Sequence, residues 1–421
     1  MELKEATYKS TEIGLIPEDW ELRELKYLLK SKPSYGINAP AVDYKDHLPQ
    51  YLRITDISDE GSYLKNGKVS VKHSDSNNFK LEEGDLVFAR TGASVGKTYL
   101  YDSKDGELVY AGFLIKVSPD PEKLNTKLLF AFTRTQPYWN WVKVMSMRSG
   151  QPGINGNEYG SLKIPLPPTT EEQQAIATAL SDVDTLISNL DKLIAKKKAI
   201  KQGAMQRLLK SPTLGGQRLP GFEGEWVEKR VSQIMNVSRG GSPRPIQAFM
   251  THSQNGINWI KIGDTEKNGK YITSSQERII PEGEMFSRKV NIGDFLLSNS
   301  MSFGRPYILK IDGCVHDGWL VLQNYQTSLD TEFLYYLLTS NVVYQQYMSK
   351  AAGSGVLNLN KELVKTIDLV FPKTLDEQQA IAKVLFDMDK EIESIETKKS
   401  KYLRIKQGMM QELLTGKTRL V

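Results

Sequence analysis

A long direct repeat constrains the fold of this chain more than any other feature of its sequence. The segment Glu172–Ala177, which reads Glu-Gln-Gln-Ala-Ile-Ala, recurs as Glu377–Ala382, and Ile200–Gly203 recurs as Ile405–Gly408. Both pairs are offset by 205 positions (377 − 172 and 405 − 200), with no gap between them. The 421 residues are therefore about two copies of one plan, and such a repeat implies an approximate two-fold relation between its halves.

The two copies are most alike over one long helix. Thr169 and Thr374 each stand three positions before a glutamate, which is the pattern of a capping box at a helix start. Each helix is expected to continue for about 40 residues, and the natural partner for its apolar stripe is the stripe of the other copy. Alternating steps of four and three residues define the stripes: Ile176, Leu180, Val183, Ile187, Leu190 and Ile194 in the first copy, and Ile381, Leu385, Met388, Ile392 and Ile395 in the second.

The segments that precede the helices differ more between the copies. Short β-rich runs alternate there with Gly, Asn, Asp and Pro turns, which indicates mixed α/β domains. The sequence predicts an α+β protein in which two such domains are separated by two long helices, packed as an intramolecular coiled coil with pseudo-two-fold symmetry. The expected boundaries are 1–168 for the first domain, 169–212 for the central helix, 213–373 for the second domain and 374–421 for the C-terminal helix.

Catalytic motifs are weak in this sequence. The loop Gly92–Thr98 resembles a phosphate loop, but only three residues separate its glycines where the pattern needs four. The acidic pair Asp182 and Asp184 is expected to be solvated on an exposed helix face. The histidines, His47, His73, His252 and His316, are scattered without the spacing of metal ligands, so no metal site is predicted.

The charge and the cysteine content set broad limits. The formal net charge of +5 permits an anionic partner without requiring one. The single cysteine, Cys314, fits a reducing cytosol. No stretch approaches the ~20 apolar residues that span a bilayer, so we expect a cytoplasmic protein with no membrane partner.

Loops rich in Arg, Lys, Ser, Asn, Gln and Gly occur at corresponding places in both domains. These side chains are the ones that contact DNA phosphates and base edges. The candidate DNA-binding residues are Arg90, Thr91, Ser94, Lys97, Arg148, Gln151 and Asn155 in the first copy, and Arg239, Ser242, Arg244, Asn299, Ser302, Arg305, Asn358 and Asn360 in the second.

Several of these stretches together resemble one protein family. Ile16–Trp20 (Ile-Pro-Glu-Asp-Trp), Gly84–Gly92 (Gly-Asp-Leu-Val-Phe-Ala-Arg-Thr-Gly) and the duplicated Glu-Gln-Gln-Ala-Ile-Ala helix start are similar to the specificity subunit of type I restriction-modification enzymes, over essentially the whole chain. The resemblance implies a non-catalytic subunit with two target recognition domains. Each would read one half of a bipartite, asymmetric sequence in double-stranded DNA.

The resemblance also implies partners and cofactors. This chain would bind no cofactor. Two methyltransferase subunits would bind S-adenosylmethionine and dock on the helices, while restriction (translocase) subunits would use ATP and Mg. Duplicated glutamines on the helices, expected to face outward, are the candidate docking residues: Gln173, Gln174, Gln202, Gln206, Gln378, Gln379, Gln407 and Gln411.

Two alternative functions stay open at this point. One is a nucleotide-dependent enzyme that uses the Gly92–Thr98 loop. The other is a coiled-coil scaffold that makes no contact with DNA.

Overall fold

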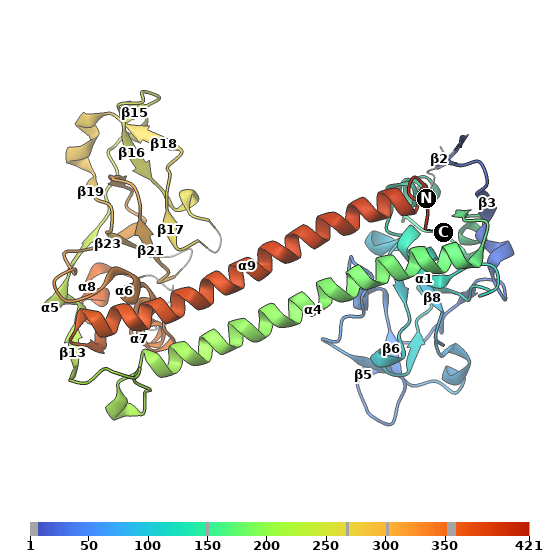
Figure 1. The fold of residues 1–421 in the computed structure, drawn as a ribbon, viewed down its shortest axis with the longest axis horizontal. Helices are drawn as coiled ribbons and strands as arrows, with labels where there is room; N and C mark the ends of the chain where they lie inside the picture. Colours follow the sequence, from blue (N-terminus) through green and yellow to red (C-terminus); the bar gives the residue numbers. More distant parts are fainter. Residues whose placement is uncertain (1–6, 148–150, 267–268, 300–302, 352–358, 421) are drawn as a thin grey trace. The chain divides into compact units, whose positions relative to one another are not determined.

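The computed structural model describes residues 7–147, 151–266, 269–299, 303–351 and 359–420. The chain divides into two compact units, Met1–Asp191 with Thr397–Val421, and Lys192–Glu396. The division falls inside both long helices, so each unit combines one α/β domain with a part of each helix (Figure 1).

The α/β domain of the first unit contains two four-stranded sheets. The sheet nearer the helices has the order β4-β11-β8-β9 and is antiparallel, and the second has the order β10-β6-β7-β5, in which β10 and β6 are parallel. Two further pairs, β1-β2 and β3-β12, are two-stranded. The elements are β1 (Tyr8–Thr11), β2 (Gly14–Pro17), β3 (Glu21–Glu24), β4 (Ser34–Tyr35), β5 (Ala41–Asp43), β6 (Gln50–Leu52), β7 (Val69–Val71), β8 (Leu86–Ala89), β9 (Thr98–Leu100), β10 (Leu108–Tyr110), β11 (Leu114–Val117), α1 (Thr126–Phe132), α2 (Gln136–Met145), α3 (Gly156–Gly160) and β12 (Lys163–Leu166), with 3-10 helices η1 (Leu25–Leu28), η2 (Ile54–Asp56), η3 (Ser76–Phe79), η4 (Gly92–Ser94) and η5 (Ser103–Asp105).

The central strand β8 is buried on both faces, which explains its continuous apolar sequence. Leu86 and Phe88 pack with α1, α2 and the start of the long helix. Val87 and Ala89 point the other way and pack against β6 and β10 of the second sheet. The alternation of side chains along one strand therefore joins the helical layer to the second sheet.

The second unit repeats this plan, but each of its two main sheets has five strands. Their orders are β14-β23-β20-β21-β17 and β15-β18-β16-β22-β19, and β13 pairs with β24. Phe295 and Leu297 of β20 pack on the helical side, and Leu296 packs on the other. The elements are β13 (Trp226–Arg230), α5 (Val231–Ile234), β14 (Asn236–Arg239), β15 (Met250–Thr251), β16 (Ile257–Ile260), β17 (Tyr271–Ile272), β18 (Glu277–Ile279), β19 (Arg288–Val290), β20 (Phe295–Ser298), β21 (Pro306–Leu309), β22 (Gly313–Val315), β23 (Trp319–Gln323), α6 (Thr331–Leu338), α7 (Asn341–Ala351), α8 (Lys361–Lys365) and β24 (Asp368–Pro372), with η6 (Pro212–Leu214), η7 (Ile246–Phe249), η8 (Ile262–Asp264) and η9 (Pro281–Phe286).

The long helices are α4 (Thr170–Leu208) and α9 (Leu375–Leu413), each of 39 residues. Within each unit their segments lie side by side and antiparallel (Figure 1). The predicted pairing of the two helices is thus confirmed. Buried stripe residues include Ile176 and Leu180 in the first unit and Ile381 and Leu385 in the second. None of the helices in the described residues is both long and apolar enough to cross a membrane.

Two lysines that follow the apolar stripes in sequence, Lys201 and Lys406, form duplicated ion pairs. Lys406 of α9 pairs with Asp184 of α4 in the first unit, and Lys201 of α4 pairs with Asp389 of α9 in the second. Both members are offset by 205 (406 − 201 and 389 − 184), so the pairing repeats with the helices exchanged. The expectation that Asp184 is simply solvated was wrong, because the opposing helix supplies it with a cation.

Candidate DNA-recognition loops and partner-docking residues

Arg90 follows β8 directly and is held by both neighbouring segments. Its amide donates to the carbonyl of Phe113 at 3.0 Å, and its carbonyl accepts from the amide of Ile154 at 2.9 Å. The guanidinium lies over the ring of Tyr35, 4.9 Å from the centroid, and its Nε is buried with no hydrogen-bond partner among the described residues. In the part of the chain that the structure describes, the ring of Tyr35 thus supports the guanidinium while the Nε donor has no acceptor.

The loop after Arg90 does not have the form of a phosphate loop. The amides of Gly92, Val95, Gly96 and Lys97 all donate to main-chain carbonyls, those of Pro152, Gly92, Ala89 and Ser94 respectively. A phosphate loop needs such amides free to converge on the ligand. The geometry therefore gives no support to the alternative of a nucleotide-dependent enzyme.

Other predicted contacts of the first domain surround this loop. Thr91 forms a β-bridge with Gly153, and Ser94 is half-buried in η4. Gln151 is exposed, with its amide close to Gly92, where the positive φ of +70° favours glycine. Lys97 lies 2.7 Å from the carboxylate of Asp59, and its side chain is 25% exposed. The charge of Lys97 is thus already partly compensated by Asp59.

The duplicated asparagines have a structural role. Asn155 accepts from the amide of Glu158 at 2.9 Å and caps α3, while Asn360 accepts from the amide of Leu363 at 2.8 Å and caps α8. Helix capping accounts for their recurrence, so duplication alone no longer argues for DNA contact there. Three other predicted residues, Arg148, Ser302 and Asn358, lie outside the described residues.

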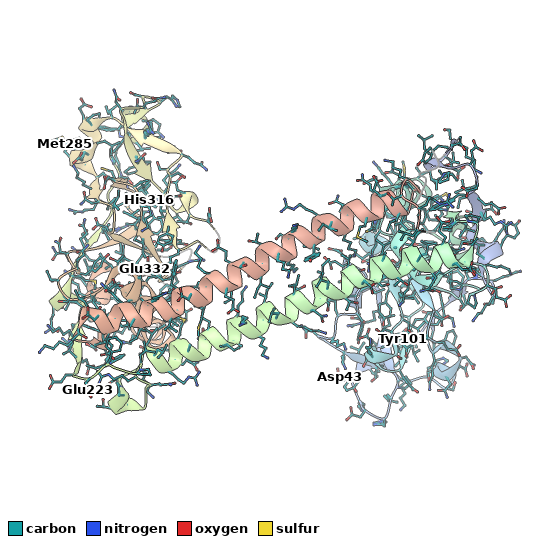
Figure 2. All side chains as sticks on the ribbon, viewed as in Figure 1. Asp43, Tyr101, Glu223, Met285, His316 and Glu332 are labelled. Carbon is teal, nitrogen blue, oxygen red and sulfur yellow. The ribbon has the colours of Figure 1, made fainter. Side chains whose placement is uncertain are left out.

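Three predicted residues of the second domain gather around Asp317. Arg239 donates from Nε to the main-chain carbonyl of Asp317 at 2.9 Å, and Ser242 donates to its carboxylate at 3.1 Å. Arg244 lies 3.7 Å from the same carboxylate, with a side chain that is 84% exposed. His316, labelled in Figure 2, precedes Asp317, and burial lowers the pKa of its imidazole. Asp317 therefore holds two arginines, Arg239 and Arg244, close together.

Asn299 and Arg305 flank the loop that follows β20. The carbonyl of Asn299 accepts from the amide of Leu359 at 2.9 Å. Arg305 donates to the carbonyl of Gly269 at 3.0 Å, and its guanidinium lies over the ring of Tyr307, 5.3 Å from the centroid. Both residues are half-buried.

The expectation that all the helix glutamines face outward was wrong for Gln173 and Gln378. Gln173 accepts from the amide of Asn125 and donates to the carbonyl of Lys123, at 2.9 and 3.1 Å. Gln378 makes the equivalent contacts with Asp330 and Ser328, at 2.8 and 3.0 Å. Both side chains are buried. They tie each long helix to the loop that caps α1 or α6, which explains why they recur.

The remaining six glutamines are exposed: Gln174, Gln202, Gln206, Gln379, Gln407 and Gln411. In the first unit, Gln407 and Gln411 line a cavity of about 710 Å³ together with Trp139 and Met410. Leu15, which is also exposed, lies at the same cavity. This combination of apolar and amide groups is typical of a protein-binding surface.

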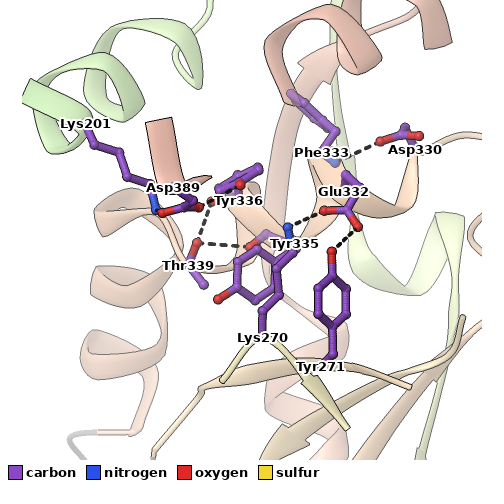
Figure 3. A network of polar contacts seen from close by, with 10 residues as sticks. All are labelled: Lys201, Lys270, Tyr271, Asp330, Glu332, Phe333, Tyr335, Tyr336, Thr339 and Asp389. Carbon is purple, nitrogen blue, oxygen red and sulfur yellow. Dashed lines mark hydrogen bonds and ion pairs between the residues drawn. The ribbon is translucent and has the colours of Figure 1, made fainter. Parts of the chain in front are cut away.

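The sequence patterns missed a partly buried polar network in the second unit (Figure 3). Lys270 pairs with Glu332 of α6, which also accepts from the hydroxyl of Tyr271 at 2.7 Å. The Lys270 ammonium lies over the ring of Tyr336, 4.4 Å from the centroid, and the hydroxyl of Tyr336 donates to Asp389 of α9 at 2.7 Å. Burial lowers the pKa of Lys270. The network connects the α/β domain to both long helices, and no local motif signals it.

A second missed feature involves the glutamates at the helix starts. Thr169 accepts from the amide of Glu172 at 3.2 Å, as a cap does, but the Glu172 side chain pairs with Arg419 and does not reach back. Glu377 likewise pairs with Arg218, at 2.9 Å. The expectation of a reciprocal capping box was therefore wrong in its second half.

Comparisons with known proteins agree with this architecture. A family model described as "Type I restriction modification DNA specificity domain" matches residues 17–202 and 223–403. A protein of Methanocaldococcus jannaschii, provisionally described as the specificity subunit of type I restriction enzyme MjaX, is 29% identical over 99% of this chain and 98% of its own length. The MjaVIII specificity subunit of the same organism is 24% identical over 99% of this chain and 97% of its own length.

Solved structures show the same fold. A chain from a study of complex assembly and conformational transition in the type I R-M system has a TM-score of 0.59 at 17% identity, over 96% of this chain and 99% of that one. The S subunit of a type I restriction-modification system from M. genitalium has a TM-score of 0.56 at 17% identity, over 94% of this chain and 96% of that one. With two matched specificity domains that together cover most of its length, the chain belongs to the family of type I restriction-modification specificity subunits.

Proposed function

We propose that this specificity subunit reads a bipartite, asymmetric target in double-stranded DNA, with one half-site for each recognition domain. The observation that carries the proposal is that two domains share one sheet plan but present different side chains at its loops. Arg90 stands beside Tyr35 after β8. In the second domain Asn299 follows β20, and two exposed arginines, Arg239 and Arg244, lie at Asp317. A common frame with different contact groups is what reading two different half-sites requires.

We assign DNA contact to loops in each domain. Arg90 and Gln151 are placed to reach base edges, and Arg239 and Arg244 to reach phosphates or bases. Thr91, Ser94, Lys97, Ser242, Asn299 and Arg305 complete the described residues that we propose for DNA binding.

The long helices are proposed to dock two methyltransferase subunits. The support is the duplication of exposed glutamines, Gln202 and Gln206 on α4 and Gln407 and Gln411 on α9, which two identical partners would contact alike. Specificity subunits of type I systems are non-catalytic. S-adenosylmethionine would therefore be bound by the methyltransferases, and ATP with Mg by restriction subunits, in a cytoplasmic complex.

Exchanging the first recognition domain tests the proposal. A chain in which residues 1–168 come from another specificity subunit should direct methylation to a sequence with one half changed and the other half retained. Sequencing of methylated genomic DNA, from cells that co-express a type I methyltransferase subunit, measures both halves at once. A methylated sequence that changed in both halves, or in neither, would contradict the assignment of one half-site to each domain.

A second experiment tests the docking surface. Gln407→Glu with Gln411→Glu should weaken association with the methyltransferase subunit at least about tenfold, since two buried charges would replace neutral contacts at an interface. Analytical ultracentrifugation of the co-expressed proteins measures the association. Gln247→Glu, at an exposed position of the second domain, is the matched control. Equal association of all variants would remove these glutamines from the interface.

A further inference from the structure

We propose that Arg90 and Asn299 occupy the same structural position in the two recognition domains and read a base at corresponding places in the two half-sites. Arg90 would read guanine and Asn299 adenine. The inference rests on the proposed function, because it requires each domain to read its own half-site, and it goes further by naming one base contact in each.

The strand register places the two residues at the same point. In the first unit, Ala89 is the last residue of β8 to pair with β11, opposite Leu114, and the amide of Arg90 donates to the next carbonyl, that of Phe113. In the second unit, Ser298 of β20 pairs with Trp319 of β23. The amide of Asn299 then donates to the carbonyl of Gly318 at 3.4 Å.

A second contact, on the other side of the chain, agrees with this register. The carbonyl of Arg90 accepts from Ile154, and that of Asn299 accepts from Leu359, both at 2.9 Å. Ile154 and Leu359 are 205 positions apart (359 − 154), and each precedes the asparagine that caps the next short helix. Two independent backbone contacts therefore define the equivalence.

The neighbouring strand supplies an equivalent side chain in each domain. Tyr35 of β4 pairs with Ile115, and Arg239 of β14 pairs with Leu320. A glycine follows each of them, Gly36 and Gly240, at a point where a Cβ would collide with a main-chain carbonyl of the adjacent segment. In the first domain this neighbour, Tyr35, supports the guanidinium of Arg90.

Arg90 differs from the other described arginines of its domain in what its side chain contacts. Arg23, Arg53 and Arg134 pair with the carboxylates of Glu21, Asp56 and Asp184. In the part of this domain that the structure describes, the Arg90 guanidinium makes no hydrogen bond or ion pair. The ring of Tyr35 orients this arginine before any ligand binds. The guanidinium can therefore donate two hydrogen bonds to a pair of acceptor atoms on a ligand such as DNA.

Base chemistry then assigns the two bases. Guanine presents two acceptors in the major groove, O6 and N7, which match two N–H donors of a guanidinium. Adenine presents an acceptor at N7 and a donor at N6, which match the donor and the acceptor of an asparagine amide. Substituting one residue for the other at the same position should therefore exchange the preferred base.

The reciprocal exchange tests the inference. After genomic sequencing identifies the wild-type target, Arg90→Asn and Asn299→Arg complexes are titrated with duplexes carrying each of the four bases at each half-site position. Arg90→Asn should move the preference at one position of the first half-site from guanine to adenine, and Asn299→Arg should do the reverse in the second. The change in the binding ratio should be about 5- to 100-fold.

Two variants serve as controls. Arg23→Asn removes an exposed, ion-paired arginine of the same domain and should change neither half-site. Tyr35→Phe keeps the ring beneath the guanidinium and should retain the guanine preference, whereas Tyr35→Ala should reduce it. In every variant the untouched half-site reports whether the complex is folded.

Other results would overturn the inference. If Arg90→Asn weakens binding to all duplexes equally and reduces the salt dependence by about one counterion, Arg90 contacts a phosphate. If the domain exchange changes half of the target but neither point exchange moves a base preference, only this inference fails. If the domain exchange itself leaves the target unchanged, the proposed function fails instead.

Discussion

Replacing Arg419 with alanine is expected to destabilise the first unit by about 3 kcal/mol. Arg419 follows α9 and donates from Nη2 to the carboxylate of Glu172 at 2.7 Å, and from Nη1 to Asp19 at 3.0 Å. The Glu172 side chain is only 1% exposed. Alanine would leave that carboxylate buried without a counter-charge. We expect the lower end of the range for broken buried pairs, because the Arg419 side chain is itself 24% exposed.

Denaturant unfolding and hydrogen exchange in the first turns of α4 measure this effect. Lys417→Ala, at an exposed position two residues earlier, is the matched control and should change stability by less than about 0.5 kcal/mol. Adding Glu172→Met to Arg419→Ala should restore most of the stability, because it removes the stranded charge. If the single variant were as stable as the wild type, Glu172 would not depend on Arg419.

The same arrangement occurs in the second unit with the helices exchanged. Arg218 follows α4 and pairs with Glu377 at the start of α9, and Trp226 donates to the same carboxylate at 3.2 Å. In each unit, the arginine after one long helix therefore holds the glutamate that begins the other. We expect Arg218→Ala to destabilise the second unit in the same way.

The long helices could be predicted because their signal is local. A stripe at steps of three and four is visible in sequence and indicates a helix with one buried face. The stripe did not predict that its first residues, such as Ile176 and Ile381, pack into the core of an α/β domain. The ion pairs between the helices could not be predicted with equal ease. Lys406 and Asp184 are 222 positions apart (406 − 184), and their meeting depends on the antiparallel register, which the stripe alone does not fix.

Duplication in the sequence proved ambiguous between folding and binding. Gln173 and Asn155 recur because each holds a loop or caps a helix, whereas Gln407 recurs and is exposed. A single sequence contains no signal that separates these cases, since helix faces become buried or exposed only through tertiary packing. In the structure, two of the predicted docking residues, Gln173 and Gln378, are buried, and the other six are exposed.

The proposed DNA-recognition loop after β8 could be predicted only in part. Arg90 could be chosen from its loop composition, but its partner Tyr35 lies 55 positions earlier (90 − 35). The order β4-β11-β8 places the two residues two strands apart in one sheet. Strand order of this kind depends on long-range pairing, so the sequence alone could not supply the ring that orients the guanidinium.

Raising the pH from about 10 to 12 is expected to unfold the protein, because buried tyrosines are protonated in the native state. Burial raises the pKa of Tyr325 to about 12, and that of Tyr335 to about 12. In the unfolded chain, tyrosine has a pKa of about 10. Between these values the native state binds more protons than the unfolded state. The contribution of each such tyrosine to stability is therefore complete below pH ~10 and falls above it by about 1.4 kcal/mol per pH unit.

Lys270 acts in the opposite direction, and the balance can be measured. Its pKa is lowered by burial, so up to the unfolded value of about 10.4 the unfolded state binds more protons at this site and stability rises with pH. The effect of this one lysine on stability is smaller than the summed effect of the tyrosines, since burial also raises the pKa of Tyr138 and Tyr347. Circular dichroism and tyrosinate absorbance, followed together from neutral to high pH, should show unfolding and ionisation in a single transition.

Tyr325→Phe should make the fall of stability with pH shallower by about one proton. Tyr27→Phe, at a tyrosine that is 64% exposed, should leave the slope unchanged. Tyr325→Phe also removes the hydrogen bonds of the hydroxyl with Thr331 and with the carbonyl of Gly293. This loss shifts stability equally at every pH and so does not alter the slope. Ionisation of all the tyrosines near pH ~10 without loss of the folded signal would contradict the burial of these hydroxyls.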